Sequence, residues 1–162
     1  MLHWLQEASE GSALIGALLQ IIHLDLYNGG ILALTNLANN PSLVKEGEAV
    51  LAILKLWAIP FTGYSIISNR SSPVHRDSSR PEAYDLLATV GSYHSGKMKL
   101  PGLGLILDYN PRTVVALLGR IVLHEVPEVV GNRVCLAYYM RDSVHERVQV
   151  PVPGWMNISK YQ

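Results

Sequence analysis

Apolar residues follow two different periods along this chain of 162 residues, and the change comes near residue 60. In the first part the apolar residues recur at helical spacing. One apolar stripe there consists of Leu14, Leu18, Ile21 and Ile22. Asn28-Gly29-Gly30 is expected to break this segment, and Ser42 is expected to cap a later helix that stops at Pro60. The first part of the chain is therefore predicted to be helical.

After Pro60 the pattern changes to short runs of β-branched and aromatic residues between turn residues such as Ser71-Ser72-Pro73. The runs predict strands at 64–68, 84–89, 105–108, 113–118, 121–124 and 133–141. Short strands at a spacing of roughly 8–12 residues are typical of a sandwich or a barrel. We therefore expect one α+β domain over residues 1–162, in which residues 1–58 form a helical support outside a β core of residues 59–150.

Composition and charge exclude several classes of protein. Hydrophobic residues make up 49% of the chain and charged residues 16%, which excludes a disordered protein. The 13 basic and 13 acidic residues balance, so the chain is not a strongly basic tail that binds nucleic acid by charge alone. The single cysteine, Cys135, excludes a disulfide scaffold and a cysteine-rich zinc site. No secretory signal is visible, and polar residues interrupt the most apolar window, 13–34, so we expect an intracellular protein.

The first candidate for chemistry is the triplet His75-Arg76-Asp77. On a strand, residues two apart point to the same face, so the side chains of His75 and Asp77 are expected to project together. A solvated turn after Pro73 is the alternative interpretation of this short triplet. A second candidate is His124, which follows an apolar run 49 residues after His75 and has a structural histidine as its alternative.

The third candidate is Arg133, which opens a predicted strand. Strand alternation places Arg133 on one face with Cys135, Ala137 and Tyr139. An arginine among small residues on an inward face needs an anionic partner, because an unpaired buried charge is costly. That partner is either a ligand or, in the alternative interpretation, the carboxylate of Glu125 or Glu128.

Taken together, the three candidates form a specific pattern. Two histidines and one carboxylate make the facial triad of non-haem Fe(II) oxygenases, which leaves coordination positions open for a co-substrate and O2. An arginine shortly after the second histidine presents a planar fork that fits the distal carboxylate of 2-oxoglutarate. This order of residues is that of 2-oxoglutarate dioxygenases with a double-stranded β-helix, or jelly-roll, core.

Three sequence blocks carry a resemblance to a known family. They are N-R-S-S-P-V-H-R-D at 69–77, Y-D-L-L-A-T-V-G at 84–91 and R-V-C-L-A-Y-Y-M at 133–140. Over residues 57–147 the chain resembles the TET/JBP-type 2-oxoglutarate/Fe(II)-dependent dioxygenases, in particular their expanded fungal branch. The resemblance implies that the catalytic metal ligands are His75, Asp77 and His124. It also implies that Arg133 binds 2-oxoglutarate and that Tyr139 lies near the target base.

Basic residues near the triad are candidates for contact with a DNA substrate, and ordinary solvated surface is the alternative. They are Arg70, Arg76, Arg80, Lys97 and Lys99. Two positions depart from the family pattern. Arg80 stands where animal members have a base-contacting asparagine, and Glu125 follows His124 where a small residue is expected. The other histidines, His3, His23, His94 and His145, are not expected to bind metal.

The sequence therefore predicts an Fe(II)/2-oxoglutarate-dependent dioxygenase, an oxidoreductase that acts on a methylated nucleobase. The resemblance makes 5-methylcytosine in DNA the first candidate substrate, which implies a role in DNA demethylation and a nuclear location. We expect a monomer with Fe(II) and 2-oxoglutarate as cofactors, O2 as co-substrate, DNA as partner and no membrane contact. Two alternatives stay open: a dioxygenase of the same fold that acts on protein or small molecules, and a pseudo-enzyme that keeps the fold as a binding module.

Overall fold

The computed structural model describes residues 2–161. The chain divides into two compact units. The helical unit consists of Met1–Thr62 and Arg141–Gln162, and the barrel unit consists of Gly63–Met140. Among the residues that the structure describes, none of the helices combines the length and the apolar character that a membrane crossing needs.

The helical unit contains five α-helices and two 3-10 turns within the described residues. They are α1 (Leu2–Glu7), α2 (Ser9–Ile22), α3 (Leu24–Asn39), η1 (Pro41–Leu43), α4 (Gly47–Leu54), α5 (Asp142–Arg147) and η3 (Ile158–Tyr161). One core cluster joins α3 to the segment after α5 through Ala33, Leu37, Val148 and Val150. The helical character of the first part is thus confirmed.

The predicted apolar stripe on α2 is not the buried face of that helix. Leu14 and Ile21 are 68% and 69% exposed, whereas the buried residues of α2 are Ile15, Gly16 and Leu19. Most residues from 13 to 22 are apolar, so their spacing alone does not decide which face is buried. A small residue decides it here: a Cβ at Gly16 would lie 3.1 Å from the ring of Pro60, so the glycine allows a close approach.

Two other expectations for the helical unit are wrong. Asn28-Gly29-Gly30 lies inside α3 and does not break it. The break comes instead at His23, whose Nδ1 accepts a hydrogen bond from the backbone N–H of Leu26 at 3.2 Å and so caps α3. The helix expected from Ser42 is also shorter, because Ser42 lies in the 3-10 turn η1 and α4 begins only at Gly47.

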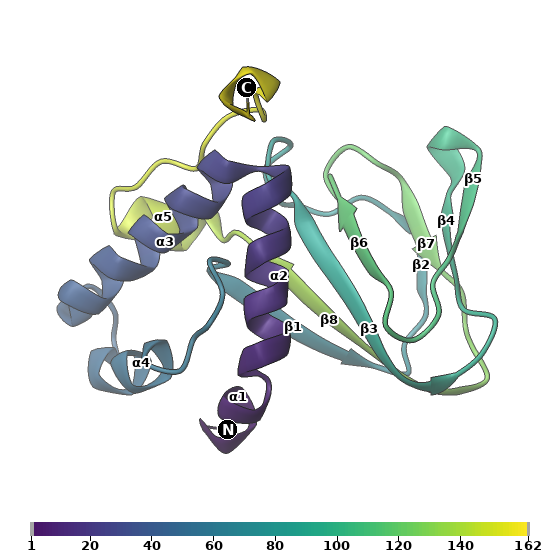
Figure 1. Ribbon diagram of the computed structural model, residues 1–162, viewed down its shortest axis with the longest axis horizontal. Helices are drawn as coiled ribbons and strands as arrows, with labels where there is room; N and C mark the ends of the chain where they lie inside the picture. The colour runs from purple at the N-terminus through teal and green to yellow at the C-terminus, as the bar shows by residue number, and fades with distance from the viewer. Residues whose placement is uncertain (1, 162) are drawn as a thin grey trace. The chain divides into compact units, whose positions relative to one another are not determined.

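The barrel unit contains eight strands in two antiparallel sheets (Figure 1). They are β1 (Gly63–Ser68), β2 (Ser72–His75), β3 (Asp85–Tyr93), β4 (Lys97–Leu100), β5 (Leu105–Asp108), β6 (Val114–Leu117), β7 (His124–Val126) and β8 (Gly131–Tyr139), with a 3-10 turn η2 (Pro101–Leu103). One sheet has the order β1-β8-β3-β6, and the other has the order β2-β7-β4-β5. The pairs β1–β8, β2–β7, β3–β6 and β4–β5 are nested, which is the topology of a jelly roll. The predicted α+β class with a double-stranded β-helix is therefore confirmed.

Strand boundaries differ from the expected ones where a turn or a sheet edge intervenes. Ser72 and Pro73 belong to β2 and not to a turn; β2 is an edge strand, where a proline is tolerated. The strand expected at 121–124 begins only at His124, because the N–H groups of Ile121 and Val122 both donate to the carbonyl of Leu118 in a turn. The strand β4 and the helix α5 were not predicted.

The register of β8 confirms the predicted alternation. On β3, Thr89 lies opposite Cys135 and Leu87 lies opposite Ala137. Leu87 packs against the core of the barrel unit, which consists of Met98, Leu100, Tyr109 and Leu117. The face of β8 that carries Cys135 and Ala137 therefore points into the barrel.

Candidate active site

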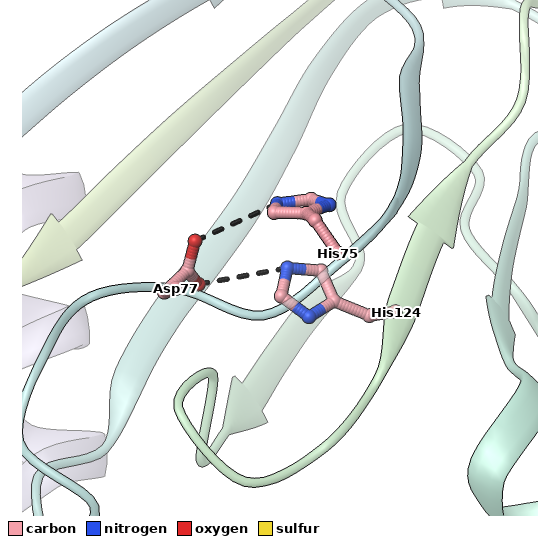
Figure 2. A group of neighbouring side chains, drawn as sticks. All are labelled: His75, Asp77 and His124. Atoms are coloured by element: carbon pink, nitrogen blue, oxygen red, sulfur yellow. Dashed lines mark ion pairs between the residues drawn. The ribbon is translucent and has the colours of Figure 1, made fainter.

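Three side chains from three separate segments meet in the barrel unit. His75 ends β2, Asp77 follows in the next loop, and His124 begins β7. The Nε2 atoms of His75 and His124 each lie 3.5 Å from a carboxylate oxygen of Asp77. Figure 2 shows the carboxylate facing both imidazole rings. One ligand atom from each residue lies within 4.8 Å of the other two, so the structure brings the predicted triad together.

Backbone carbonyls orient both imidazole rings. The Nδ1 of His75 lies 2.8 Å from the carbonyl oxygen of Pro73, and the Nδ1 of His124 lies 3.0 Å from that of Val122. A carbonyl only accepts, so each Nδ1 carries a proton, and in the neutral ring the lone pair that can bind a metal is on Nε2. This is the arrangement that metal-bound histidines show, with the second nitrogen donating to a carbonyl.

The register of β2 and β7 explains why the two rings are neighbours. His75 and His124 are paired residues of the two antiparallel strands, and their ring centroids lie 4.1 Å apart. Asp77 lies beyond the end of β2, so strand alternation is not what directs its side chain. Its backbone N–H donates instead to the carbonyl of Gly119 at 2.9 Å, which fixes the loop.

The donor set fits a divalent first-row metal. Two neutral imidazoles and one carboxylate suit Fe(II), and the absence of thiolate among the three removes the ligand that favours zinc. Neighbouring ligand atoms on one such ion lie about 3 Å apart, and each histidine Nε2 lies 3.5 Å from a carboxylate oxygen of Asp77. His124 is 3% exposed, whereas His75 and Asp77 are half-buried, so the site is partly accessible to solvent.

Arg133 is a buried cation with no carboxylate partner in residues 2–161. It is 3% exposed, and its guanidinium donates to the backbone carbonyls of Pro127, at 3.2 Å, and of Arg70. Glu125, one of the two carboxylates considered as a partner, pairs instead with Lys99 at 2.9 Å. The salt bridge of the alternative interpretation is therefore not formed, and the charge is available for an anionic ligand.

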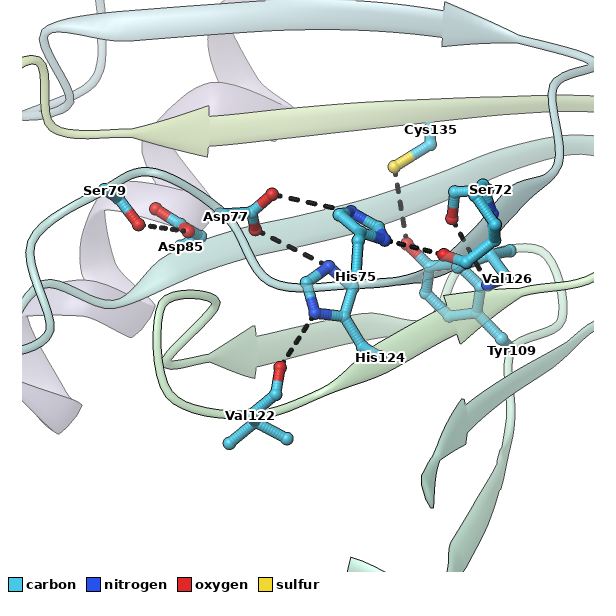
Figure 3. A network of polar contacts seen from close by, with 11 residues as sticks. Ser72, His75, Asp77, Ser79, Asp85, Tyr109, Val122, His124, Val126 and Cys135 are labelled. Carbon is cyan, nitrogen blue, oxygen red and sulfur yellow. Dashed lines mark hydrogen bonds and ion pairs between the residues drawn. The ribbon is translucent and has the colours of Figure 1, made fainter. Parts of the chain in front are cut away.

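Tyr109 and Cys135 lie beside this arginine and were not assigned a site role from the sequence. The Tyr109 hydroxyl is 3.4 Å from the Cys135 sulfur, its only hydrogen-bond partner in the described part of the chain (Figure 3). Burial raises the pKa of both groups, so the hydroxyl and the thiol stay protonated. The alternation along β8 already placed Cys135 on the inward face, so there was a reason in the sequence to consider it. Tyr109 follows β5, and no pattern in the sequence pointed to it.

A second carboxylate lies next to Asp77. Asp85 begins β3, is 5% exposed, and accepts a hydrogen bond from the Ser79 hydroxyl at 3.3 Å. Its other oxygen, Oδ1, has no hydrogen-bond partner. Burial, and then the charge of Asp77, raise the pKa of Asp85 to about 7. In the sequence, only its position at the start of an apolar strand distinguished Asp85.

Tyr139 lies at the end of β8 on the face that carries Arg133, as predicted from the alternation. Its ring packs over Gly63, where a Cβ would lie 2.3 Å from the ring, and its hydroxyl is 3.1 Å from that of Ser65. Tyr138 points to the opposite face, where its ring lies 4.7 Å from that of Tyr64. The base-contacting role of Tyr139 stays a prediction.

The basic residues near the triad have different surroundings. Arg76 is exposed, and its Nε donates to the carbonyl of Ile121 at 2.9 Å. Arg80 is exposed as well. Lys97 pairs with Asp108, and Lys99 pairs with Glu125. The two lysines thus have protein carboxylates as partners, and Glu125 does not enter the metal ligand set.

The other histidines lie outside the triad, as expected. His3 is exposed and lies 3.6 Å from the carboxylate of Glu7, and His94 is exposed on its loop. His23 and His145 are buried in the helical unit, where each contacts a backbone carbonyl. Among the described residues, His75, Asp77 and His124 form the group whose ligand atoms lie close enough together to hold one metal ion.

A jelly roll that brings two histidines of one sheet and a carboxylate together, with a buried arginine on β8 of the other sheet, has the architecture of the non-haem Fe(II) oxygenases. The chain belongs to the Tet_JBP family, described as the oxygenase domain of the 2OGFeDO superfamily, which it matches over residues 3–142. The predicted TET/JBP family is therefore confirmed, with an oxygenase domain of the superfamily that uses Fe(II) and 2-oxoglutarate, whereas the fungal branch stays a prediction.

The chain was also compared with solved structures and with curated proteins. The chain is similar to a solved structure described as NgTET1 in complex with 5mC DNA, with 14% identity and a TM-score of 0.49. The match covers 76% of this chain and 47% of that one, so the chain spans about half the length of NgTET1 in that structure. No curated protein matches the chain.

Proposed function

We propose that this protein is an Fe(II)/2-oxoglutarate-dependent dioxygenase that oxidises the methyl group of a nucleobase, with 5-methylcytosine in DNA as the first substrate to test. One observation carries the proposal: the lone pairs of two carbonyl-oriented imidazoles and the carboxylate of Asp77 meet at one point of the barrel. The membership of the Tet_JBP family supports the same chemistry.

The residues that hold the metal are His75 and His124, through Nε2, and Asp77, through its carboxylate. When bound, Fe(II) and 2-oxoglutarate supply the activation of O2, coupled to the conversion of 2-oxoglutarate into succinate and CO2. The protein fixes the orientation of both imidazole rings, because each Nδ1–H donates to a backbone carbonyl.

Arg133 binds the distal carboxylate of 2-oxoglutarate in this proposal. Its guanidinium is already desolvated and has only carbonyl partners, so an incoming carboxylate gains a charge-assisted pair without displacing a protein anion. The Tyr109 hydroxyl and the Cys135 thiol are protonated neighbours of this arginine. Both are neutral hydrogen-bond donors beside the arginine.

The nucleobase assignment rests on the family and on the sequence blocks that resemble it. A base inside a duplex cannot reach the metal, so it must leave the stack, which costs a few kcal/mol. Tyr139 is the proposed contact for the extruded base, and exposed Arg76 and Arg80 are the proposed phosphate contacts. A DNA substrate implies a nuclear location, and we propose in addition that the protein acts as a monomer.

The test is succinate release from 2-oxoglutarate, measured with methylated and unmethylated duplexes of one sequence. The proposal predicts that methylated DNA stimulates succinate release, that oxidised base appears in the same reaction, and that Asp77→Ala abolishes both. DNA binding should weaken steeply with salt, because phosphate contacts release counterions.

One observation favours a second candidate function. Lys97 and Lys99 are engaged with Asp108 and Glu125, which reduces the positive charge that a DNA backbone would meet. A dioxygenase of the same fold that acts on protein or small molecules is compatible with this. It predicts succinate release that methylated DNA does not stimulate, and DNA binding with little salt dependence.

A further inference from the structure

The loop between β6 and β7 contacts the site at two consecutive residues. The N–H of Asp77 donates to the carbonyl of Gly119 at 2.9 Å, and the Nε of Arg76 donates to the carbonyl of Ile121 at 2.9 Å. The same loop leads directly into His124. It therefore links the second metal ligand to the third.

Gly119 lies against two carboxylates at once. A Cβ built on Gly119 would lie 2.2 Å from Oδ2 of Asp77 and 2.7 Å from Oδ2 of Asp85. Both separations are far below normal contact, so a side chain at this position would displace the Asp77 carboxylate. Figure 3 shows Asp85 beside Asp77, with the two histidine rings on the other side of Asp77 in that view.

The backbone does not explain why this residue is a glycine. Gly91, Gly104 and Gly131 have positive φ values and need glycine for that reason, whereas Gly119 is not among the residues with positive φ. A glycine is needed at position 119 because the carboxylates of Asp77 and Asp85 occupy the space that a Cβ would fill.

The side chain of Asp85 is buried and held in one position, although its burial is costly. It is 5% exposed, the Ser79 hydroxyl holds one of its oxygens, and its Oδ1 is buried without a hydrogen-bond partner. A buried polar atom without a partner is costly, and such atoms are rare in folded proteins. An alanine here would open space into which the Asp77 carboxylate can turn.

We propose that Gly119 and Asp85 are positioning residues for Asp77: the missing side chain of Gly119 leaves the slot that the Asp77 carboxylate occupies, and the Asp85 side chain fills the adjoining space by its shape. This inference rests on the proposed function, since it assumes that Asp77 is a metal ligand. Neither residue touches the metal, and each acts through Asp77.

The experiment measures Mn(II) affinity by electron paramagnetic resonance, without any turnover, in the wild type and four variants. Gly119→Ala should weaken Mn(II) binding about 10- to 100-fold, the range found when residues that orient a metal ligand are lost. Gly102→Ala is the matched control, because its Cβ would meet its nearest atom only at 3.9 Å, and it should bind as the wild type does. Asp85→Ala should weaken binding, whereas Asp85→Asn keeps the shape and should bind as the wild type does.

Each result decides a separate point. If wild-type protein does not bind Mn(II), the proposed function and this inference both fail. If wild-type protein binds and Gly119→Ala binds equally well, only the role of Gly119 is overturned. Wild-type affinity in Asp85→Ala overturns the role of Asp85, and equal losses in Asp85→Ala and Asp85→Asn show that charge and not shape is involved. If Gly119→Ala does not fold, as judged by circular dichroism, the Asp85 pair still tests the inference.

Discussion

His23 of the helical unit and the two triad histidines of the barrel unit use their ring nitrogens in different ways. In the helical unit, His23 uses both ring nitrogens for backbone contacts: Nδ1 accepts from the N–H of Leu26, and Nε2 lies 3.1 Å from the carbonyl of Gly154. In the barrel unit, His75 and His124 use only Nδ1 in this way, and both Nε2 atoms face Asp77.

Burial therefore does not separate a structural histidine from a candidate ligand. His23 and His124 are 1% and 3% exposed, and both lie at the start of an element. The difference between His23 and His124 is the partner of Nε2, which is the backbone carbonyl of Gly154 for His23 and the carboxylate shared with His75 for His124.

The largest effect is expected for His124→Ala, which removes a ligand. Mn(II) affinity should fall by more than about 100-fold, beyond the loss typical of residues that only orient a ligand. His23→Ala should leave Mn(II) affinity unchanged and lower the free energy of unfolding by about 1–3 kcal/mol, because the N–H of Leu26 loses its partner. Metal titration and urea unfolding of both variants measure these effects. Loss of metal in His94→Ala, with His124→Ala unaffected, would show that the third ligand is misassigned.

The next effect concerns Arg133, the buried cation of the barrel unit. Arg133→Ala should weaken 2-oxoglutarate binding by roughly 2–5 kcal/mol and leave Mn(II) affinity nearly unchanged. Arg133→Lys should recover little, since a point charge does not replace the planar fork. Calorimetric titration of the Mn(II)-loaded protein with 2-oxoglutarate measures this. Unchanged affinity in folded Arg133→Ala would mean that the carbonyls of Pro127 and Arg70 are its only functional partners.

A smaller effect is expected at the end of β8. Stacking a base on an aromatic ring contributes roughly 1–3 kcal/mol, so Tyr139→Ala should lower turnover of methylated DNA by about one to two orders of magnitude. Succinate release without DNA should survive. Tyr138→Ala is the control: it removes the ring contact with Tyr64 and should change thermal stability and not turnover. The opposite pattern in the two variants would contradict the base-contacting role.

The last effect concerns the dependence of stability on pH. The folded protein without metal holds the pKa of Asp85 at about 7, above the value of about 3.9 for an unfolded aspartate. Between these values the unfolded chain binds fewer protons, so the free energy of unfolding should fall as pH rises, by at most about 1.4 kcal/mol per pH unit. Above the pKa of Asp85 in the folded protein, the free energy of unfolding should no longer fall with pH. Asp85→Asn should remove it, which urea unfolding of the metal-free protein between pH 4 and 8 measures; an unchanged slope in this variant would assign the titration to another group.

The barrel unit was more predictable from the sequence than the helical unit. Alternation along a strand has a period of two, so placing Arg133 on the inward face also placed Cys135 and Tyr139 there. Helix α2 is apolar on most sides, and its buried face was decided by Gly16 beside Pro60, which no local pattern shows.

Within the site, the sequence predicted the residues that carry chemistry better than those that hold them. His75, Asp77 and His124 are chemically distinctive and were identified from type and order. Gly119 and Asp85 become neighbours of Asp77 only after the loops before β3 and β7 fold back on each other. Contacts between residues so far apart in sequence come from the jelly-roll topology and not from local spacing.

The central claim is that the triad and Arg133 serve one metal and one co-substrate. An anaerobic titration of the Fe(II)-loaded protein with 2-oxoglutarate tests it directly, because chelation of Fe(II) by 2-oxoglutarate gives a visible charge-transfer absorption. The absorption should appear in the wild type, be absent in Asp77→Ala, and require far more 2-oxoglutarate in Arg133→Ala. A wild-type protein that binds Fe(II) but develops no such absorption at saturating 2-oxoglutarate would contradict the account.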